Sequence, residues 1–251
     1  MAGVGVKPVA DPVAEGRRIV EAAAAEGVPL RALGGVAVAM LCPSSHHPLL
    51  SRSYADIDLA TTKSAKDQVV ALLESLEYTG DKEFNMLHGH RRLYFWDEHA
   101  QRQVDVFVDE ANLCHRIDLR RRLEAVPLTL SLADLTVLKL QVVETNEKDY
   151  LDLCAIFADH ELTADDSGIN SAYIAELTAS DWGLWRTLTM VAERTEQFAS
   201  ELTGFEAAGV VVERLGRLRT ELEAAPKSRG WKLRARIGDR KRWYELPEEV
   251  R

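Results

Sequence analysis

Hydrophobic and polar residues alternate in several short segments of the first half of the chain. Residues 29–33, 54–59 and 104–108 carry apolar side chains at alternate positions or in a short apolar run. This pattern is typical of β-strands, whose side chains point to opposite faces in turn. Segments 84–88 and 92–96 show the same tendency. We therefore expect strands in all five segments.

Apolar residues recur at helical spacing between these strands and throughout the second half. Helices are expected over 12–26 and 36–41, and a third begins at a capping-box pattern formed by Ser64 and Asp67. From Ser131 onward the spacing is helical almost without interruption. The helices expected in that half are 132–144, 146–160, 171–178, 182–199 and 207–224.

This order of elements predicts an α+β protein, in which a mixed β-sheet flanked by helices is followed by a mostly helical C-terminal half. We expect residues 1–128 to form an α/β domain and residues 129–251 a helical domain with a basic tail. No run of about 18 apolar residues is present, so no membrane span is expected. Three widely separated cysteines without a C-x-x-C pair indicate reduced thiols and a cytoplasmic protein.

Three acidic residues interrupt the apolar pattern of the predicted strands. Asp56 and Asp58 share one strand face while Ile57 and Leu59 share the other, and Asp105 stands among valines. Neighbouring carboxylates repel and are expensive to bury unless they are paired. A divalent ion such as Mg²⁺, which prefers oxygen ligands, would explain them. The alternative is a polar strand face, or an edge strand, that meets solvent.

Two glycines, Gly34 and Gly35, directly follow the first predicted strand and precede an apolar helix. Glycines at such a junction let a phosphate approach the backbone and the helix N-terminus. Three acids on neighbouring strands could hold two divalent ions, which stabilise the attacking and leaving oxygens in phosphoryl or nucleotidyl transfer. The combination is much more specific than any of its parts.

Three motifs, Leu33-Gly34-Gly35, Asp56-Ile57-Asp58 and Val104-Asp105-Val106, resemble the signature of the DNA polymerase β-type nucleotidyltransferase superfamily. Arg52, together with segments 134–141 and 147–153, resembles the abortive-infection branch, which includes mycobacterial toxins that add nucleotides to tRNA. The resemblance covers roughly residues 29–159. It departs from the family in the 20 residues between Gly35 and Asp56, and in a glycine at position 35 where serine is usual.

This resemblance implies a nucleotidyltransferase-type sheet and a Mg²⁺-dependent reaction that transfers NMP from an NTP to an acceptor hydroxyl. Two Mg²⁺ ions are expected. By similarity, Asp56 and Asp58 would bind both ions. Asp105 would bind the catalytic ion and orient or deprotonate the acceptor hydroxyl.

The resemblance also implies a set of phosphate-binding residues. Gly34 and Gly35 would contact the triphosphate, and Arg52 and Lys139 would neutralise its charge. Asp149 corresponds to the acid that follows the lysine in the family's active site. Each has a plainer alternative, because Lys139 could extend to solvent from an apolar helix face and Asp149 could complete a helix cap.

Charge distribution bears on the acceptor. The net charge of −9 argues against a protein that coats nucleic acid, yet residues 227–244 concentrate basic and aromatic side chains, and 120–122 are three arginines. Such a tail could contact RNA through phosphates and bases, or pack its tryptophans on acidic helices of the same chain. We expect tRNA or another RNA as acceptor, and a toxin would require an antitoxin partner. Two rivals stand: modification of a small molecule or protein, and a catalytically silent binding module.

Overall fold

The computed structural model describes residues 7–246, and its contacts group the chain into two compact units. The sheet unit comprises the chain up to Leu41 and the segments Ser53–Ala111 and Ile117–Leu130. The helical unit comprises Cys42–Arg52, Asn112–Arg116 and the chain from Ser131 onward. The helical unit thus starts its long segment close to the expected boundary between residues 128 and 129, and it also takes in two short segments from the first half.

A five-stranded mixed sheet forms the centre of the sheet unit, as the alternating pattern predicts. The strands lie in the order β1-β2-β5-β4-β3. Their bounds are β1 (Leu30–Leu33), β2 (Asp56–Thr61), β3 (Thr79–Gly80), β4 (Arg92–Asp97) and β5 (Arg102–Val108). Only β2 and β5 are parallel, and the other neighbours are antiparallel. The predicted α+β class is confirmed.

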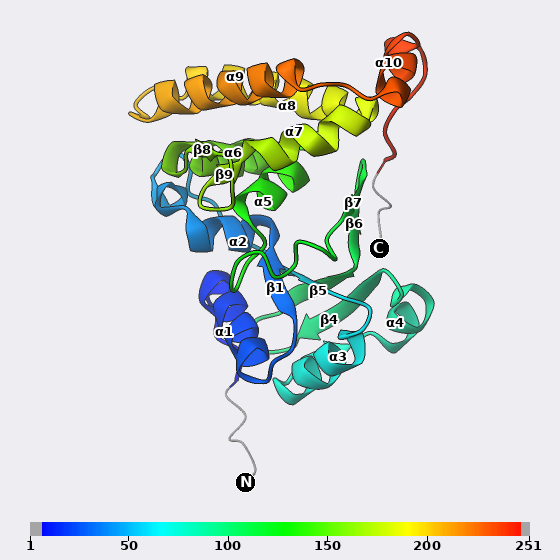
Figure 1. Cartoon of the computed structure of the whole chain (residues 1–251). Coiled ribbons are helices and arrows are strands. Elements are labelled where there is room, and N and C mark those ends of the chain that lie inside the picture. Colours follow the sequence, from blue (N-terminus) through cyan, green and yellow to red (C-terminus); the bar gives the residue numbers. More distant parts are fainter. Residues whose placement is uncertain (1–6, 247–251) are drawn as a thin grey trace. The chain divides into compact units, whose positions relative to one another are not determined.

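Apolar residues at alternate strand positions form the core of the sheet unit. Ile57 and Leu59 of β2 and Val104 and Val106 of β5 are fully buried. The helices of this unit are α1 (Pro12–Ala25), α2 (Gly34–Leu41), α3 (Lys66–Ser75) and α4 (Lys82–His88). Helices α1 and α3 lie on the same side of the sheet (Figure 1). The opposite strand positions, which carry the acids, therefore belong to the other face.

Two local predictions for the sheet unit are wrong. Residues 84–88, expected as a strand, belong to helix α4, because the Asp81 carboxylate accepts a hydrogen bond from the Phe84 backbone N–H at 2.9 Å and caps the helix. The capping box predicted at Ser64 does not form. The Ser64 hydroxyl lies 2.9 Å from that of Thr62, and α3 begins after Ala65 without a side-chain cap.

Most elements of the helical unit agree with the helical spacing of the sequence. Its helices are α5 (Leu132–Leu140), α6 (Glu147–Asp159), α7 (Ser171–Ser180), α8 (Trp182–Glu201), α9 (Ala208–Ala224) and α10 (Arg229–Ala235), with 3₁₀ turns at η1 (Pro43–His46) and η2 (Gly238–Arg240). Helices α8 and α9 run side by side (Figure 1) and bury Leu188, Val191, Leu215 and Leu218 between them and their neighbours. Helix α5 ends four residues earlier than the predicted residue 144.

Polar caps start the two helices that matter most for the candidate site. The Ser131 hydroxyl accepts a hydrogen bond from the Asp134 backbone N–H at 3.2 Å at the start of α5. Asn146 and Asp149 form the predicted capping box of α6. These caps fix where each helix begins and therefore which α5 and α6 side chains face each other.

Two pairs of short strands and the cysteines complete the described part of the fold. The short strands are β6 (Glu110–Asn112) with β7 (Arg116–Asp118), and β8 (Leu162–Thr163) with β9 (Ile169–Asn170). Cys42, Cys114 and Cys154 are buried free thiols. Between residues 7 and 246, no helix combines the length and the apolar character that a membrane crossing would require.

Candidate active site

The junction between β1 and α2 brings backbone and carboxylate into close contact. Gly34, the residue after β1, has a φ of +68°, a conformation that favours glycine. A Cβ placed on Gly34 would lie 2.3 Å from Oδ2 of Asp58. The Asp58 carboxylate therefore occupies the space that any other side chain at position 34 would fill. Gly35, the second residue of α2, is half-buried beside it in the chain.

Asp58 and Asp105 are register partners on the parallel strands β2 and β5. Residues paired in this way point to the same face of a sheet, and their strands are about 4.8 Å apart. Asp56 lies two positions before Asp58 and so shares that face. Asp56 is exposed, Asp58 is half-buried and Asp105 is 1% exposed. The sequence predicts the shared face of Asp56 and Asp58, and the strand register adds Asp105 to it. Because β5 is a central strand, Asp105 is not an edge residue.

Asp105 is held by polar neighbours within the sheet. Its Oδ1 accepts a hydrogen bond from Nε of Arg92 at 2.7 Å, and its Oδ2 accepts one from the side chain of Gln103. Burial, with smaller contributions from the carboxylates of Asp105 and Asp81, raises the pKa of Tyr94, the register partner of Asp105 on β4. The buried carboxylate is thus balanced by one guanidinium that the sequence analysis missed.

The donor set on this face suits a magnesium ion. In residues 7–246, no three His, Cys, Asp or Glu side chains are already gathered as a metal cluster, and Asp105 faces Arg92 instead. Nevertheless, Asp56, Asp58 and Asp105 supply only carboxylate oxygens, the hard ligands that Mg²⁺ prefers. The absent Cβ at Gly34 leaves the Asp58 carboxylate next to the start of α2, where backbone N–H groups favour anions such as phosphate. The residues present therefore fit Mg²⁺ with a phosphate ligand.

A second polar cluster, the Asp152 network, lies inside the helical unit. Nζ of Lys139 on α5 lies 2.9 Å from Oδ1 of Asp149 and 2.7 Å from Oδ2 of Asp152, both on α6. Arg52 forms a two-pronged ion pair with Asp152, at 2.9 Å from Nε and 2.8 Å from its terminal nitrogen. All four side chains are at least 86% buried, since the most exposed, Arg52, is 14% exposed.

This network determines the state of Lys139. Burial alone would lower the pKa of Lys139, but the carboxylates of Asp152 and Asp149 outweigh burial and raise it. The lysine therefore remains charged and does not extend to solvent. Asp149 both caps α6, as the plainer alternative predicts, and pairs with Lys139. Its part in an active site stays a prediction.

Asp152 is the residue in this network that the sequence analysis missed. It lies three positions after Asp149, a spacing that places both carboxylates on one face of α6. That spacing was the available signal. Its partner Arg52, 100 residues earlier in the chain, could not be inferred from helix periodicity.

No protein-family model matches this chain, and none of the curated proteins matches it. Among solved structures, JHP933 from Helicobacter pylori is similar with 13% sequence identity and a TM-score of 0.40. The similarity covers 87% of this chain and 93% of that one. Because a likeness at this level carries no functional argument, the function proposed below rests on the chain's own residues.

Proposed function

We propose that this chain is a Mg²⁺-dependent nucleotidyltransferase, which transfers NMP from an NTP to an acceptor hydroxyl and releases pyrophosphate. One observation carries the proposal: the Asp58 carboxylate lies against the backbone of Gly34 and is in register with Asp105. This arrangement joins a pair of acids to a helix start where only glycine fits. The family resemblance of the three motifs adds support from the sequence.

Three carboxylates would hold the metal. Asp56 and Asp58 on β2 and Asp105 on β5 share one sheet face, and Mg²⁺ bound there would neutralise charge on the phosphate oxygens during transfer. Asp105, almost fully buried, has its orientation fixed by Arg92 and Gln103. A carboxylate held in this way is suited to orient an acceptor hydroxyl, whereas accepting its proton would require Arg92 to release the carboxylate.

Glycine at position 34 lets the Asp58 carboxylate lie against the start of α2. A metal ion held by this carboxylate could bring a phosphate to the N–H groups in the first turn of α2, where the helix dipole favours negative charge. Gly35 belongs to that turn and keeps its predicted contact with the triphosphate. This contact needs no charged side chain.

Arg52 and Lys139 remain candidates for phosphate neutralisation, with one qualification from their surroundings. Both cations are paired with Asp152, and Lys139 also with Asp149. A phosphate would have to compete with these carboxylates. The pairs support a structural role within the helical unit, in which Asp152 holds Arg52 and Lys139 together.

RNA is the acceptor that we propose, because a basic segment near the C-terminus supplies cations in an acidic chain. A tRNA would fit this description, and a toxin of this kind would have an antitoxin partner in the cytoplasm. A small molecule or a protein side chain is the alternative acceptor, since the net charge of −9 suits a cationic small molecule.

The test is incubation of the full chain with each α-³²P-labelled NTP, Mg²⁺ and total cellular RNA. Asp58→Asn and Asp105→Asn should abolish labelling, because each keeps the side-chain shape and removes a metal-binding charge. Asp67→Asn is the matched control, since its side chain is 96% exposed on α3, and it should label like the unaltered chain.

Each outcome has a distinct meaning. Labelled RNA that is lost in both site variants supports the proposal and names the NTP. Label on protein or on a small molecule, lost in the same variants, redirects the acceptor. Mg²⁺-dependent NTP binding that Asp58→Asn leaves unchanged, or no such binding at all, would sink the proposal in favour of a silent binding module.

A further inference from the structure

The C-terminal segment of the described chain has a charge opposite to that of the rest. Residues 227–246 contain eight lysines and arginines against two acids, a net charge of +6 in a chain whose total is −9. The segment includes α10 and the 3₁₀ turn η2 and belongs to the helical unit. We call residues 227–246 the basic tail.

Tryptophans anchor the basic tail on α8. The ring of Trp231 meets that of Trp185 edge-on at 5.1 Å, and Trp243 meets Trp182 edge-on at 5.8 Å. The indole N–H of Trp243 also donates to the Thr187 hydroxyl at 3.0 Å. The reading in which the tail packs on its own chain therefore applies to these tryptophans, although they meet aromatic rings of α8 and not acidic side chains.

One arginine closes the basic tail on itself. The guanidinium of Arg234 lies 4.4 Å from the ring centre of Trp182 and donates to the backbone carbonyls of Gly238 and Lys241 at 2.8 and 2.7 Å. Its role is therefore structural. Arg234 and the tryptophans hold the tail in a fixed conformation, so its remaining cations are presented from a folded surface.

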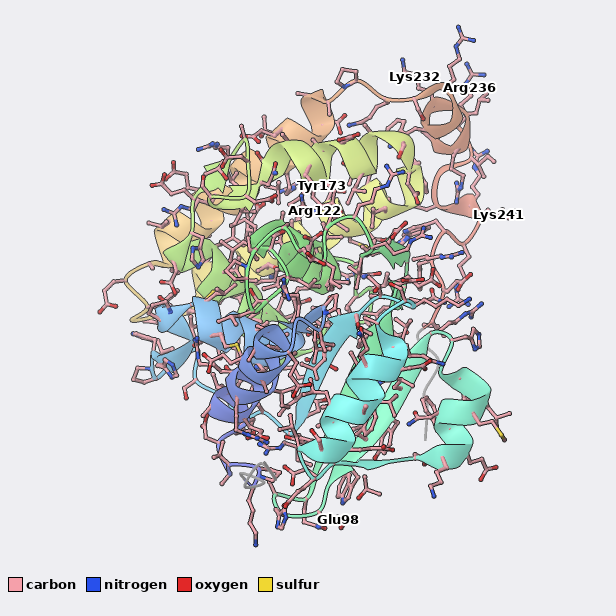
Figure 2. All side chains as sticks on the ribbon, turned by 60° about the horizontal axis from the view of Figure 1, so that its bottom comes forward. Glu98, Arg122, Tyr173, Lys232, Arg236 and Lys241 are labelled. Atoms are coloured by element: carbon pink, nitrogen blue, oxygen red, sulfur yellow. The ribbon has the colours of Figure 1, made fainter. Side chains whose placement is uncertain are left out.

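Six of the seven remaining cations are exposed, while Lys227 donates to the backbone carbonyl of Leu222. The exposed ones are Arg229, Lys232, Arg236, Arg240, Lys241 and Arg242. Figure 2 shows Lys232, Arg236 and Lys241 extending away from the ribbon. None of the six is within ion-pair distance of a carboxylate in residues 7–246. Four are arginines, whose planar guanidinium matches a phosphate with two hydrogen bonds.

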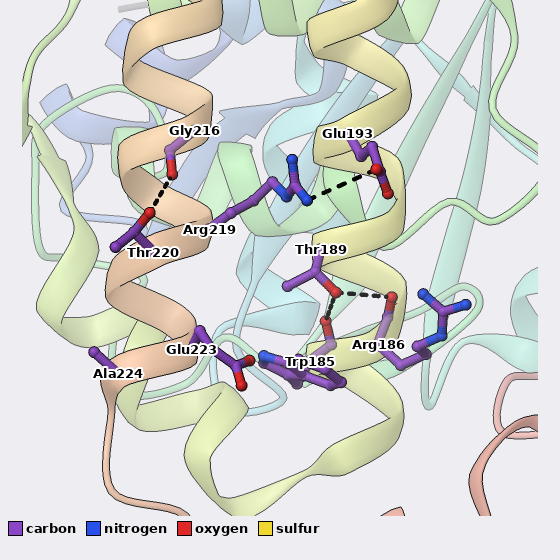
Figure 3. A pocket seen from close by; sticks show the side chains of 9 residues that line it. All are labelled: Trp185, Arg186, Thr189, Glu193, Gly216, Arg219, Thr220, Glu223 and Ala224. Atoms are coloured by element: carbon purple, nitrogen blue, oxygen red, sulfur yellow. Dashed lines mark hydrogen bonds and ion pairs between the residues drawn. The ribbon is translucent and has the colours of Figure 1, made fainter.

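A groove beside the tail shows the opposite pattern. It has a volume of about 690 Å³ and lies between α8 and α9 (Figure 3). Its arginines are paired with acids, Arg219 with Glu193 and Glu196, and Arg186 with Asp239. Because its cations are already matched, the groove offers no surplus positive charge. The positive charge available to a ligand is therefore that of the six exposed tail cations, and not that of the groove.

We propose, on the basis of the nucleotidyltransferase function above, that these exposed cations bind the phosphodiester backbone of an RNA. A membrane-binding helix would direct its aromatic residues into the lipid. Here Trp231 and Trp243 contact rings of α8, and the exposed large aliphatic residues of the tail are separated along the chain, with Leu233, Ile237 and Leu246 being 61%, 44% and 50% exposed. Since the bases' natural stacking partners are occupied, recognition is by phosphate and is independent of sequence.

The test measures binding of the full chain to a fluorescent single-stranded RNA of about 20 nucleotides, by anisotropy between about 50 and 200 mM salt. The tail variant is K232E/R236E/K241E. The control is K66E/K82E/K148E, which makes the same charge change in the first turns of α3, α4 and α6, where glutamate is favourable.

We expect the tail variant to bind RNA about 10- to 100-fold more weakly and to lose about 2 from the slope of log affinity against log salt, at ~0.7 for each phosphate contact. The control should change neither by comparable amounts. Equal binding by both variants would overturn the inference. So would tail-dependent binding of polyglutamate or phosphatidylserine vesicles with no binding of RNA.

Two further measurements keep the result interpretable. Mg²⁺-dependent ATP binding, followed by thermal shift, should be the same in the unaltered chain, the tail variant and the control variant. If none of the three binds ATP, the proposed nucleotidyltransferase function fails, and RNA binding by the tail is judged separately. Should charge reversal unfold the tail, K232Q/R236Q/K241Q retains the helix-forming character and should still weaken RNA binding in proportion to the charge removed.

Discussion

Replacing Gly34 with alanine tests the candidate site at a backbone position where a side chain cannot fit. The new Cβ would lie 2.3 Å from Oδ2, 3.1 Å from Cγ and 3.2 Å from Cβ of Asp58. Ordinary carbon–oxygen contacts are longer than about 3.2 Å, so the carboxylate must move by roughly 1 Å. In addition, alanine at a φ of +68° costs about 1 kcal/mol.

Gly27→Ala separates these two effects. Gly27 has a φ of +69°, and a Cβ there would have no neighbour within 4 Å. Both variants should therefore lose about 1 kcal/mol of unfolding free energy in urea titrations from backbone strain. Only Gly34→Ala should also reduce NMP transfer, by about 100-fold, because displacement of a reacting group by about 1 Å has an effect of that size.

The outcome that would refute this reasoning is equal transfer activity in the Gly34 and Gly27 variants. The double variant Gly34→Ala/Asp58→Ala provides a further check on the contact itself. Truncating Asp58 removes the oxygen that the new Cβ would strike. The two changes should then be less destabilising together than the sum of their separate effects, which a double-mutant cycle measures directly.

Two further predictions concern the helical unit. Asp152→Asn should lower the free energy of unfolding in urea by about 3–5 kcal/mol, because Arg52 and Lys139 both lose a buried carboxylate partner. Asp149→Asn should cost less, since Lys139 keeps its ion pair with Asp152. Equal losses in the two variants would contradict the central place of Asp152. Burial lowers the pKa of His115, so the unfolded chain binds that proton first and stability should fall as pH drops below about 6.5. His115→Gln should flatten this fall below about pH 6.5, and an unchanged slope would count against this assignment.

Much of the fold follows from local patterns in the sequence. The alternation in 54–59 and 104–108 predicts the two central strands because their apolar residues must be buried together. The same reasoning fails at 84–88, where apolar residues also alternate. There the Asp81 cap satisfies the first backbone N–H groups of a helix, and α4 buries none of its residues. Because burial contributes little at this segment, the local hydrogen bond determines that it forms a helix and not a strand.

Local sequence patterns also predict only some residues of the candidate site. Its acids and glycines are visible in the sequence because their positions within short strands and turns are unusual. Their counterions are not visible. Arg92 is 13 residues from Asp105 and reaches it only through the antiparallel register of β4 and β5, and Arg52 is 100 residues from Asp152. Pairings at such separations depend on the tertiary fold.

The composition of the central strands favours a catalytic sheet over a silent one. On the buried face, the register pairs Ile57 with Val104 and Leu59 with Val106, and all four side chains are fully buried. Between them, position 58 is paired with position 105, and both are aspartates. Buried charged groups are often replaceable by apolar residues at no loss, or with a gain of about 1–4 kcal/mol. A carboxylate that is 1% exposed at the centre of the sheet, next to a second carboxylate and to a glycine that makes room for it, is a costly arrangement for folding alone. Metal-dependent transfer supplies a reason for all three.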